Sequence, residues 1–136
     1  MPEIRYSDKK DIEVGKLIEL YRASQYNYWW KEHNVRAMLN YSYIFLTAWS
    51  NDQLVGTITV ISDGVNNAFI DDLLVHPSFR HQKIGITLLQ KVLDKIKPLN
   101  LKFIQLIPIP GQESFFEKAG FRVIPKHQVM EISMLK

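Results

Sequence analysis

The chain has 136 residues and a formal net charge of +3, and it contains no cysteine. This length suits one domain with a single core, and 46% hydrophobic with 23% charged residues is a soluble globular composition. The small charge excess does not suggest the dense basic stripe of a nucleic-acid-binding protein, and the lack of cysteine excludes disulfides, thiolate zinc sites and cysteine nucleophiles.

Neither membrane insertion nor secretion is expected from the sequence. No apolar run comes close to the roughly 20 residues of a membrane-spanning helix. The first residues, MPEIRYSDKK, lack the apolar stretch of a secretory signal. We therefore expect a single domain over residues 1–136, located in the cytoplasm.

The first part of the chain predicts a strand and two helices. Residues 2–6 favour a short strand, and residues 9–23 favour a helix that Ser7 or Asp8 would cap. A weaker helix is expected over residues 31–40. The aromatic segment SQYNYWW separates the two helices.

A hairpin and another strand follow. Residues 43–49 and 54–61 are β-prone, and the pair Asn51-Asp52 between them supplies turn chemistry. The next strand, residues 68–75, reads AFIDDLLV, in which two adjacent Asp and two adjacent Leu break strict alternation. A β-bulge would account for this pattern, and bulges cluster near active sites. A strand buried on both faces accounts for it equally well.

The last part of the chain predicts two helices and up to three strands. Residues 84–97 form a strongly amphipathic helix, and residues 102–107 an apolar strand. The segment GQESFFEKAG favours a short helix that Gly120 closes at its C-terminus. Residues 121–135 are expected to form one or two final strands.

The junction before the long amphipathic helix is the most informative part of the sequence. Its loop carries Arg80, His81, Gln82 and Lys83 immediately before the helix begins. Bare backbone amides at a helix N-terminus, next to basic side chains, are suited to holding phosphate. The alternative is an ordinary strand–loop–helix turn whose basic side chains are simply solvated.

Two motifs in this part of the chain resemble those of a known family. The run VHPSFRHQKIGITLL is similar to the cofactor-binding motif V-x-P-x-[FY]-R-G-x-G-I-G-x-x-L-L of the GNAT superfamily, the acyl-CoA-dependent N-acyltransferases. Downstream, FFEKAGF resembles the F-Y-E-K-x-G-F segment of such domains. The resemblance covers most of the chain and implies an α+β GNAT fold, with a central mixed, mostly antiparallel sheet flanked by helices on both faces.

The resemblance also implies where acetyl-CoA, the expected cosubstrate, would bind. A bulged strand would pair with the pantetheine arm, and the loop and helix N-terminus would hold the pyrophosphate. Carried over by position, the contacts are Leu74, Val75, Arg80, His81, Gln82, Lys83, Ile84, Gly85, Ile86, Thr87 and Phe116. His81 and Lys83 stand where the family usually has glycine, which tolerates positive φ. Lys83 in turn brings a cation that can bind phosphate.

The expected chemistry is acyl transfer to an amine. Freeing a lysine-like amine at pH 7 costs about 4–5 kcal/mol, so a carboxylate base would help. The candidates are Asp72, which is preferred, and Asp71, since only one of two successive strand residues should face the cleft. A solvent-facing or loop-capping role for either is equally compatible with the sequence. The family implies a backbone N–H near Leu74 or Val75 as oxyanion donor.

The leaving group and the acceptor side both involve aromatic residues. Where this chain has Phe116, the resembled motif usually has a tyrosine that is often assigned as the general acid. Departure of the coenzyme A thiolate without such an acid costs only about 2 kcal/mol at pH 7. A general acid is therefore helpful rather than indispensable. The aromatics between Tyr26 and Trp30 would line the acceptor pocket, or else anchor the two helices to the core. The four histidines show no metal-ligand spacing, so no metal is expected.

The sequence therefore predicts a GNAT-type N-acetyltransferase that moves an acetyl group from acetyl-CoA to a primary amine by direct attack. The acceptor is expected to be a small molecule or a peptide, without nucleic acid or membrane, and a homodimer is left open. The alternative is an acyl-CoA-binding or regulatory domain that keeps the fold but has little or no activity, for which Phe116, His81 and Lys83 are the evidence.

Overall fold

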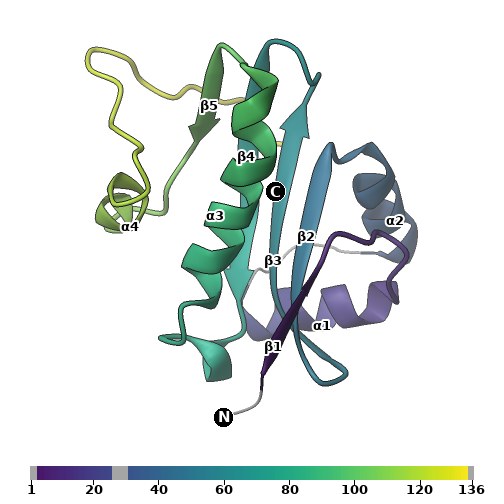
Figure 1. Ribbon diagram of the computed structural model, residues 1–136. Helices are drawn as coiled ribbons and strands as arrows, with labels where there is room; N and C mark the ends of the chain where they lie inside the picture. The colour runs from purple at the N-terminus through teal and green to yellow at the C-terminus, as the bar shows by residue number, and fades with distance from the viewer. Residues whose placement is uncertain (1–2, 26–30, 135–136) are drawn as a thin grey trace.

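A computed structural model of the protein describes residues 3–25 and 31–134 (Figure 1). The sheet and helices appear in the order that the sequence patterns predict. In chain order they are β1 (Ile4–Ser7), α1 (Val14–Ala23), α2 (Glu32–Tyr41), β2 (Ile44–Ser50), β3 (Gln53–Ser62), β4 (Asn67–Val75), the 3-10 turn η1 (Pro77–Phe79), α3 (Ile84–Ile96), the 3-10 turn η2 (Lys97–Leu99), β5 (Phe103–Leu106) and α4 (Glu113–Glu117).

The five strands form one sheet in the order β1-β2-β3-β4-β5. The first three pairings are antiparallel, and β4 pairs with β5 in parallel through the crossover helix α3. The expected mixed, mostly antiparallel sheet is therefore confirmed. Helix α3 packs on one face of this sheet, and α1 and α2 pack on the other (Figure 1).

The face under α3 forms the larger hydrophobic core. Helix α3 buries the stripe that its sequence predicts, at Ile84, Leu88, Leu89, Val92, Leu93 and Ile96. Its first turns approach β3 closely because Gly56 has no side chain. A Cβ atom at Gly56 would lie 3.1 Å from both Ile84 Cγ2 and Leu88 Cδ1. This close packing fixes the N-terminal end of α3 against the sheet.

The second core lies between the sheet and the helices α1 and α2. Leu17 and Tyr21 of α1 and Leu39 of α2 are fully buried there, against Phe45 and Leu54 of the sheet. None of the described helices is long and apolar enough to cross a membrane.

The prediction that the first helix starts near residue 9 is wrong, because α1 begins only at Val14. The guanidinium of Arg36 in α2 donates to the backbone oxygens of Lys10 and Ile12, at 3.0 and 2.7 Å. Arg36 therefore supplies the hydrogen-bond donors that these two carbonyls would otherwise find in a helix. Arg36 thus ties α2 to the segment that precedes α1.

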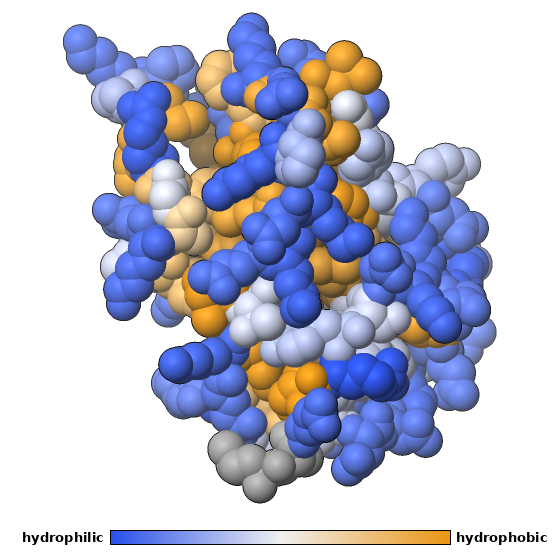
Figure 2. Space-filling view, in the orientation of Figure 1, coloured by the Kyte–Doolittle hydropathy of each residue, from blue (hydrophilic) through white to orange (hydrophobic). Residues whose placement is uncertain are grey.

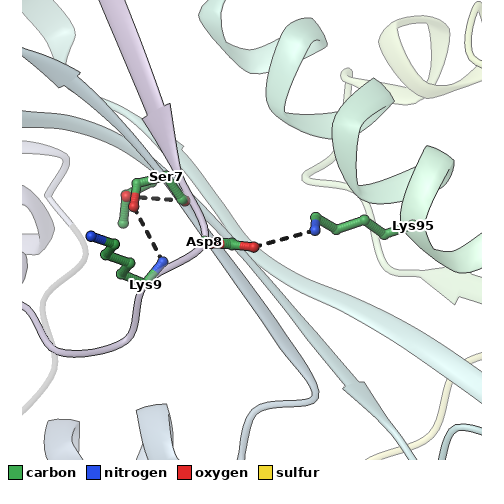
Figure 3. A network of polar contacts seen from close by, with 5 residues as sticks. Ser7, Asp8, Lys9 and Lys95 are labelled. Carbon is green, nitrogen blue, oxygen red and sulfur yellow. Dashed lines mark hydrogen bonds and ion pairs between the residues drawn. The ribbon is translucent and has the colours of Figure 1, made fainter.

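An ion pair joins the residue that follows β1 to helix α3. The Lys9 backbone N–H donates to Ser7 Oγ at 3.2 Å, and Lys95 Nζ lies 3.4 Å from Asp8 Oδ2 (Figure 3). Both side chains of this ion pair are about half exposed or more, so its contribution to stability is small. Ser7 therefore caps a turn and not, as expected, a helix.

The prediction of final strands over residues 121–135 is wrong for the described part of that segment. Helix α4 ends at Glu117, and Gly120 follows with a φ of +103°. From residue 121 to residue 134 the backbone forms no regular element. Alternating apolar residues form a strand only where a sheet edge accepts their backbone hydrogen bonds, and here the tail pairs with none of the described strands.

Candidate active site

Strand β4 carries a β-bulge at the position that the sequence pattern suggested. In its pairing with β3, Thr59 lies opposite Asp71 and Thr57 lies opposite Leu74, so two residues of β4 face one residue of β3. Asp72 adopts a φ of +51°, in the left-handed region that non-glycine residues rarely occupy. The irregular pattern of residues 68–75 therefore reflects a bulge.

The bulge changes which side chains face which core. Leu73 packs against the core under α3, whereas Leu74 packs against the core under α1 and α2. The Asp71 carboxylate accepts a hydrogen bond from the Asp72 backbone N–H, with 2.9 Å between N and Oδ1. Both carboxylates act electrostatically on the buried hydroxyl of Tyr21.

Tyr21 is a residue of this site that sequence reasoning placed only in the core. Its side chain is fully buried, and its hydroxyl donates to Met38 Sδ at 3.9 Å. Burial raises the pKa of this hydroxyl well above its usual value, and the negative charges of Asp72 and Asp71 raise it further. The hydroxyl therefore stays protonated beside the two carboxylates. The position of Tyr21 in the apolar pattern of α1 predicts only that it is buried. Its place near the bulge depends on how α1 packs against β4, which the pattern does not reveal.

The loop after β4 is built around a 3-10 turn and two residues with positive φ. The Ser78 backbone N–H donates to His76 Nδ1 at 3.1 Å, and Arg80 Nε donates to the Val75 backbone oxygen at 3.3 Å. His81 and Lys83 both have a φ of +64°. They occupy the left-handed conformation at the two positions where the resembled motif has glycine.

Helix α3 begins with unpaired backbone donors. Its first intrahelical hydrogen bond runs from the Thr87 N–H to the Lys83 oxygen, at 3.1 Å, and the Lys83 side chain provides no capping hydrogen bond. Within residues 3–25 and 31–134, no protein acceptor pairs with the N–H groups of Ile84, Gly85 and Ile86. The first turn contains no acidic residue. This end of the helix dipole thus presents free donors and positive potential to a ligand.

Gly85 lies at the surface of this helix end, next to α4. A Cβ atom there would lie 3.6 Å from Val75 Cγ2 and 3.7 Å from the Phe115 ring, which are ordinary contact distances. Packing within the protein therefore does not require a glycine at this position. Close approach of a ligand to the backbone is a role that would require one.

Helix α4 and Phe121 after it form an aromatic cluster beside the same loop. The rings of Phe115 and Phe116 meet edge to face with 5.0 Å between centroids, and the rings of Phe116 and Phe121 do so at 6.1 Å. All three side chains are partly buried against the core under α3. Phe116, expected near the cofactor, therefore also has a packing role.

The structure brings nearly all the residues named from the sequence to one end of β4 and α3. Leu74 and Val75 end the strand, and the remaining loop and helix positions follow at Arg80, His81, Gln82, Lys83, Ile84, Gly85, Ile86 and Thr87. Ile84 is buried, so only its backbone can serve a ligand, and the Thr87 hydroxyl donates to the Lys83 oxygen at 2.6 Å. The aromatics at 26–30 lie outside the described residues. Among the described residues, no cluster of His, Cys, Asp and Glu could hold a metal ion.

A sheet with a bulged fourth strand, followed by a basic loop and an uncapped helix, defines the fold of an acyl-CoA N-acyltransferase. A solved structure from meticillin-resistant Staphylococcus aureus, described as a probable acetyltransferase of unknown function, superposes with a TM-score of 0.83 at 20% identity, covering 96% of this chain and 99% of that one. An aminoglycoside 6'-N-acetyltransferase complexed with coenzyme A superposes with a TM-score of 0.74 at 19% identity, covering 88% and 86%.

Sequence comparison gives the family. The model of the acetyltransferase (GNAT) family matches residues 11–121. An uncharacterised N-acetyltransferase of Prochlorococcus marinus is 28% identical over 121 residues, which are 85% of this chain and 67% of that protein. This chain spans only 41% to 67% of the length of the curated relatives it matches. The chain belongs to the GNAT family of acetyltransferases.

Proposed function

We propose that the protein transfers an acetyl group from acetyl-CoA to a primary amine by direct attack of the amine on the thioester. The observation that carries this proposal is the row of unpaired N–H groups at Ile84, Gly85 and Ile86, which follows directly from the bulged end of β4. The structural similarity to an acetyltransferase complexed with coenzyme A supports the same ligand.

The residues at the start of α3 fit a diphosphate. The helix end offers main-chain donors and the positive end of the dipole, and Lys83 and Arg80 add cations at its edge. The side chain of Lys83 is exposed, and it makes no capping hydrogen bond that would compete with a phosphate. Gly85, where a Cβ atom would meet only ordinary contacts within the protein, leaves the backbone open to close approach.

The bulge supplies the groups for the acyl-transfer step in this proposal. A backbone N–H near Leu74 or Val75 would stabilise the oxyanion that forms on the thioester carbonyl. The amine nitrogen forms the new bond to the carbonyl carbon, and the carbon–sulfur bond breaks to release a thiolate. The proton of the attacking amine passes to Asp72, directly or through water. Asp71 holds the backbone of Asp72 in place through the hydrogen bond at 2.9 Å.

The experiment is a calorimetric titration with coenzyme A, together with a thiol-release assay using acetyl-CoA and a panel of small amines and peptides. Gly85→Ala is the decisive variant, since its methyl group would occupy the approach path of the ligand without a clash inside the protein. We expect it to weaken coenzyme A binding at least tenfold. Tight binding of coenzyme A that Gly85→Ala leaves unchanged would overturn the proposed ligand site.

Gly15→Ala provides the matched control. Gly15 is the second residue of α1, as Gly85 is the second residue of α3, and a Cβ atom at Gly15 would meet nothing within 4 Å. Both substitutions raise helix propensity by up to about 1 kcal/mol. Their effects on stability should therefore be alike, whereas only the change at Gly85 should affect binding.

A second candidate function is an acyl-CoA-binding domain with little or no catalysis. Phe116 in place of a proton-donating tyrosine favours it, as do the two side-chain-bearing residues with positive φ in the loop. This candidate predicts coenzyme A binding that Gly85→Ala weakens, but no thiol release with any amine. The same two assays therefore separate the two functions.

A further inference from the structure

Thr59 of strand β3 carries a buried hydroxyl that has no hydrogen-bond partner. The residue is only 2% exposed, and among the described residues nothing pairs with its Oγ1 atom. A buried hydroxyl in this state destabilises the fold, because in the unfolded chain the same group bonds to water. Unsatisfied groups of this kind are uncommon in native proteins, and a role in catalysis or in binding an internal water explains many of them.

Thr57, two residues earlier in the same strand, shows how a buried threonine is ordinarily satisfied here. It is fully buried and points to the same face of the sheet as Thr59. Its hydroxyl, however, donates to the Leu46 backbone oxygen at 3.2 Å. The interior of the sheet therefore provides a backbone acceptor at Thr57 but not at Thr59, and burial in β3 alone does not explain a hydroxyl at position 59.

The side chain of Thr59 points toward the bulge of β4. In the sheet register Thr59 lies between Phe45 of β2 and Asp71 of β4. Directly paired residues of neighbouring strands point to the same face, with Cβ atoms about 4.5–5.5 Å apart. Phe45 packs in the core under α1 and α2, so this face is opposite to the one in Figure 2, where hydrophilic side chains line α3. The Thr59 hydroxyl and the Asp71 carboxylate are therefore neighbours on the side of the sheet that carries Tyr21.

Asp71 has an oxygen that can accept from Thr59. One carboxylate oxygen, Oδ1, accepts from the Asp72 backbone N–H at 2.9 Å. No donor within residues 3–25 and 31–134 bonds to the other oxygen, Oδ2. An ionised carboxylate accepts several hydrogen bonds, and a threonine hydroxyl has one proton to donate. A donor without an acceptor thus lies across the sheet from an acceptor that has room for a donor.

Further buried polar atoms without a partner in the described chain lie on the two helices that cover this region. They are Ser24 Oγ, three residues after Tyr21 at the end of α1, and Asn34 Oδ1, four residues before Met38 on α2. Residues three or four apart share a helix face, and the contact between the Tyr21 hydroxyl and Met38 Sδ joins these two faces. Unsatisfied polar atoms therefore gather on the bulge side of the sheet, an environment in which proteins hold internal water.

We propose that the Thr59 hydroxyl donates to Oδ2 of Asp71, by rotation of its side chain or through one internal water, and that Thr59 is thereby a positioning residue for acyl transfer. Asp71 holds the Asp72 backbone through Oδ1, so a second hydrogen bond at Oδ2 fixes this carboxylate from both sides. Asp72 then keeps the orientation in which it takes the amine proton. The effect on rate rests on the proposed acetyl transfer, whereas the contact between Thr59 and Asp71 does not.

A double-mutant cycle in urea unfolding tests the contact without any activity. Thr59→Val nearly keeps the shape of the side chain and removes the hydroxyl. We expect Thr59→Val to lower the urea midpoint of the parent but to have little effect in the Asp71→Ala background, because the interaction is already lost there. A hydroxyl that has no partner predicts the opposite sign, since valine then removes an unsatisfied buried group and raises the midpoint. A raised midpoint, or an equal decrease in both backgrounds, would overturn the proposed contact.

Thiol-release kinetics test the positioning role. Thr59→Val should lower kcat about tenfold, which is within the usual range of coupling between residues in contact. The KM of the amine and the affinity for coenzyme A should stay close to those of the parent, and Thr59→Ser, which keeps a hydroxyl, should restore most of kcat. Thr57→Val is the matched control, because it removes a hydroxyl that bonds to the backbone from the same face of the same strand. It should lower stability and leave kcat unchanged.

The outcomes separate this inference from the function on which it rests. A parent that releases no thiol with any amine would overturn the proposed acetyl transfer and with it the effect on rate, and the unfolding cycle would still decide the contact. An active parent whose kcat is unchanged in Thr59→Val would overturn the positioning role alone. Equal losses of kcat in Thr57→Val and Thr59→Val would do the same, since they would show a general effect of the strand interior.

Discussion

The Asp71 carboxylate accepts a hydrogen bond from the Asp72 backbone N–H, with 2.9 Å between Oδ1 and N. The side chain of one aspartate thereby supports the left-handed conformation of the next, where φ is +51°. Short polar side chains tolerate this conformation because they can bond locally to the backbone. The two adjacent carboxylates thus have different roles at the bulge: Asp71 positions the backbone, and Asp72 remains the candidate base.

Asp72→Asn should lower the rate of thiol release at pH 7 by about 100-fold or more, since general-base catalysis commonly contributes 10²–10⁴-fold. The defect should shrink as pH rises toward the amine pKa of about 10.4, because the acceptor then loses its proton without help. Initial rates across this pH range, with one amine at saturation, check the prediction.

Asp94→Asn is the control for charge alone, since Asp94 is exposed on α3. It should leave the pH profile of the parent intact. A rate defect in Asp72→Asn that stays constant at all pH values would contradict a base role and would indicate a structural one.

Asp71→Ala should lower the free energy of unfolding by about 1–2 kcal/mol, because the N–H of Asp72 loses its acceptor in a half-buried position. Asp71→Asn keeps a carbonyl oxygen that can accept the same hydrogen bond, so its stability should stay close to that of the parent. Urea unfolding of the three proteins measures the difference. Equal losses in both variants would show that charge, not the hydrogen bond, supports the bulge.

Tyr21 should make the protein less stable in alkali. Burial, and then the charges of Asp72 and Asp71, raise the pKa of its hydroxyl in the folded state above the usual value near 10. Below pH 10 the Tyr21 hydroxyl keeps its proton in both the folded and the unfolded state, so its contribution to the free energy of unfolding is fully present. Above pH 10 only the unfolded state loses it, and stability should fall by up to about 1.4 kcal/mol per pH unit until the folded pKa is reached.

Urea unfolding at pH 8 and pH 11 checks this sign. Tyr21→Phe should remove most of the extra loss at the higher pH, although it also removes the contact with Met38 Sδ. Tyr41 is 89% exposed and is the matched control, at which the same substitution should leave the pH dependence unchanged. A slope in Tyr21→Phe equal to that of the parent would contradict the assignment.

Glycine at position 81 or 83 should stabilise the fold. A side chain on a residue in the left-handed region destabilises the folded state by about 1–2 kcal/mol, and glycine removes this strain. Glycine also gives the unfolded chain more conformational freedom, which offsets about 0.4–1 kcal/mol of the gain in stability. His81→Gly and Lys83→Gly should each raise the free energy of unfolding by about 0.5–1 kcal/mol, as measured in urea. Lys83→Gly also removes a cation at the helix end, so it should weaken coenzyme A binding while it strengthens the fold.

Gln82→Gly is the internal control for this loop. Gln82 lies between the two strained residues, and its φ is not positive. Glycine there gains no relief of strain and adds freedom to the unfolded chain, so stability should fall by about 0.4–1 kcal/mol. A stabilising effect at all three positions would contradict the strain argument.

Much of the fold could be predicted because burial patterns are local. The hairpin of β2 and β3 and the apolar stripe of α3 follow from alternation, from the 3.6-residue period and from the turn residues Asn51-Asp52. The bulge could be inferred as one of two explanations, since its irregularity is visible in the order of residues 68–75. The strained positions of His81 and Lys83 could be expected from the family motif, which has glycine there.

The remaining features depend on contacts between segments that are distant in the sequence. The start of α1 is set by Arg36, a residue of the next helix that holds the carbonyls of Lys10 and Ile12. The role of Tyr21 depends on the bulge of a strand some fifty residues away. The tail shows the opposite case: residues 128–134 have a strand pattern, but a strand also needs a sheet edge to pair with, and the described tail pairs with none.

Phe116→Tyr should increase the rate of acetyl transfer if thiolate departure limits turnover. The ring makes edge-to-face contacts with Phe115 and Phe121 and is only partly buried, so we expect the added hydroxyl to leave this packing in place. A thiol of pKa near 8.5 leaves as the thiolate at a cost of about 2 kcal/mol at pH 7, which limits the gain to roughly 30-fold.

Steady-state thiol release at saturating acetyl-CoA, with coenzyme A affinity measured in parallel, checks this prediction. Phe115→Tyr is the matched control, because the neighbouring ring is also partly buried but packs toward Gly85. A gain in rate with Phe116→Tyr alone, at unchanged coenzyme A affinity, would identify proton donation to the leaving sulfur as the step that this chain performs poorly. A gain in both variants would instead point to a change in packing, since a proton donor acts from one position only.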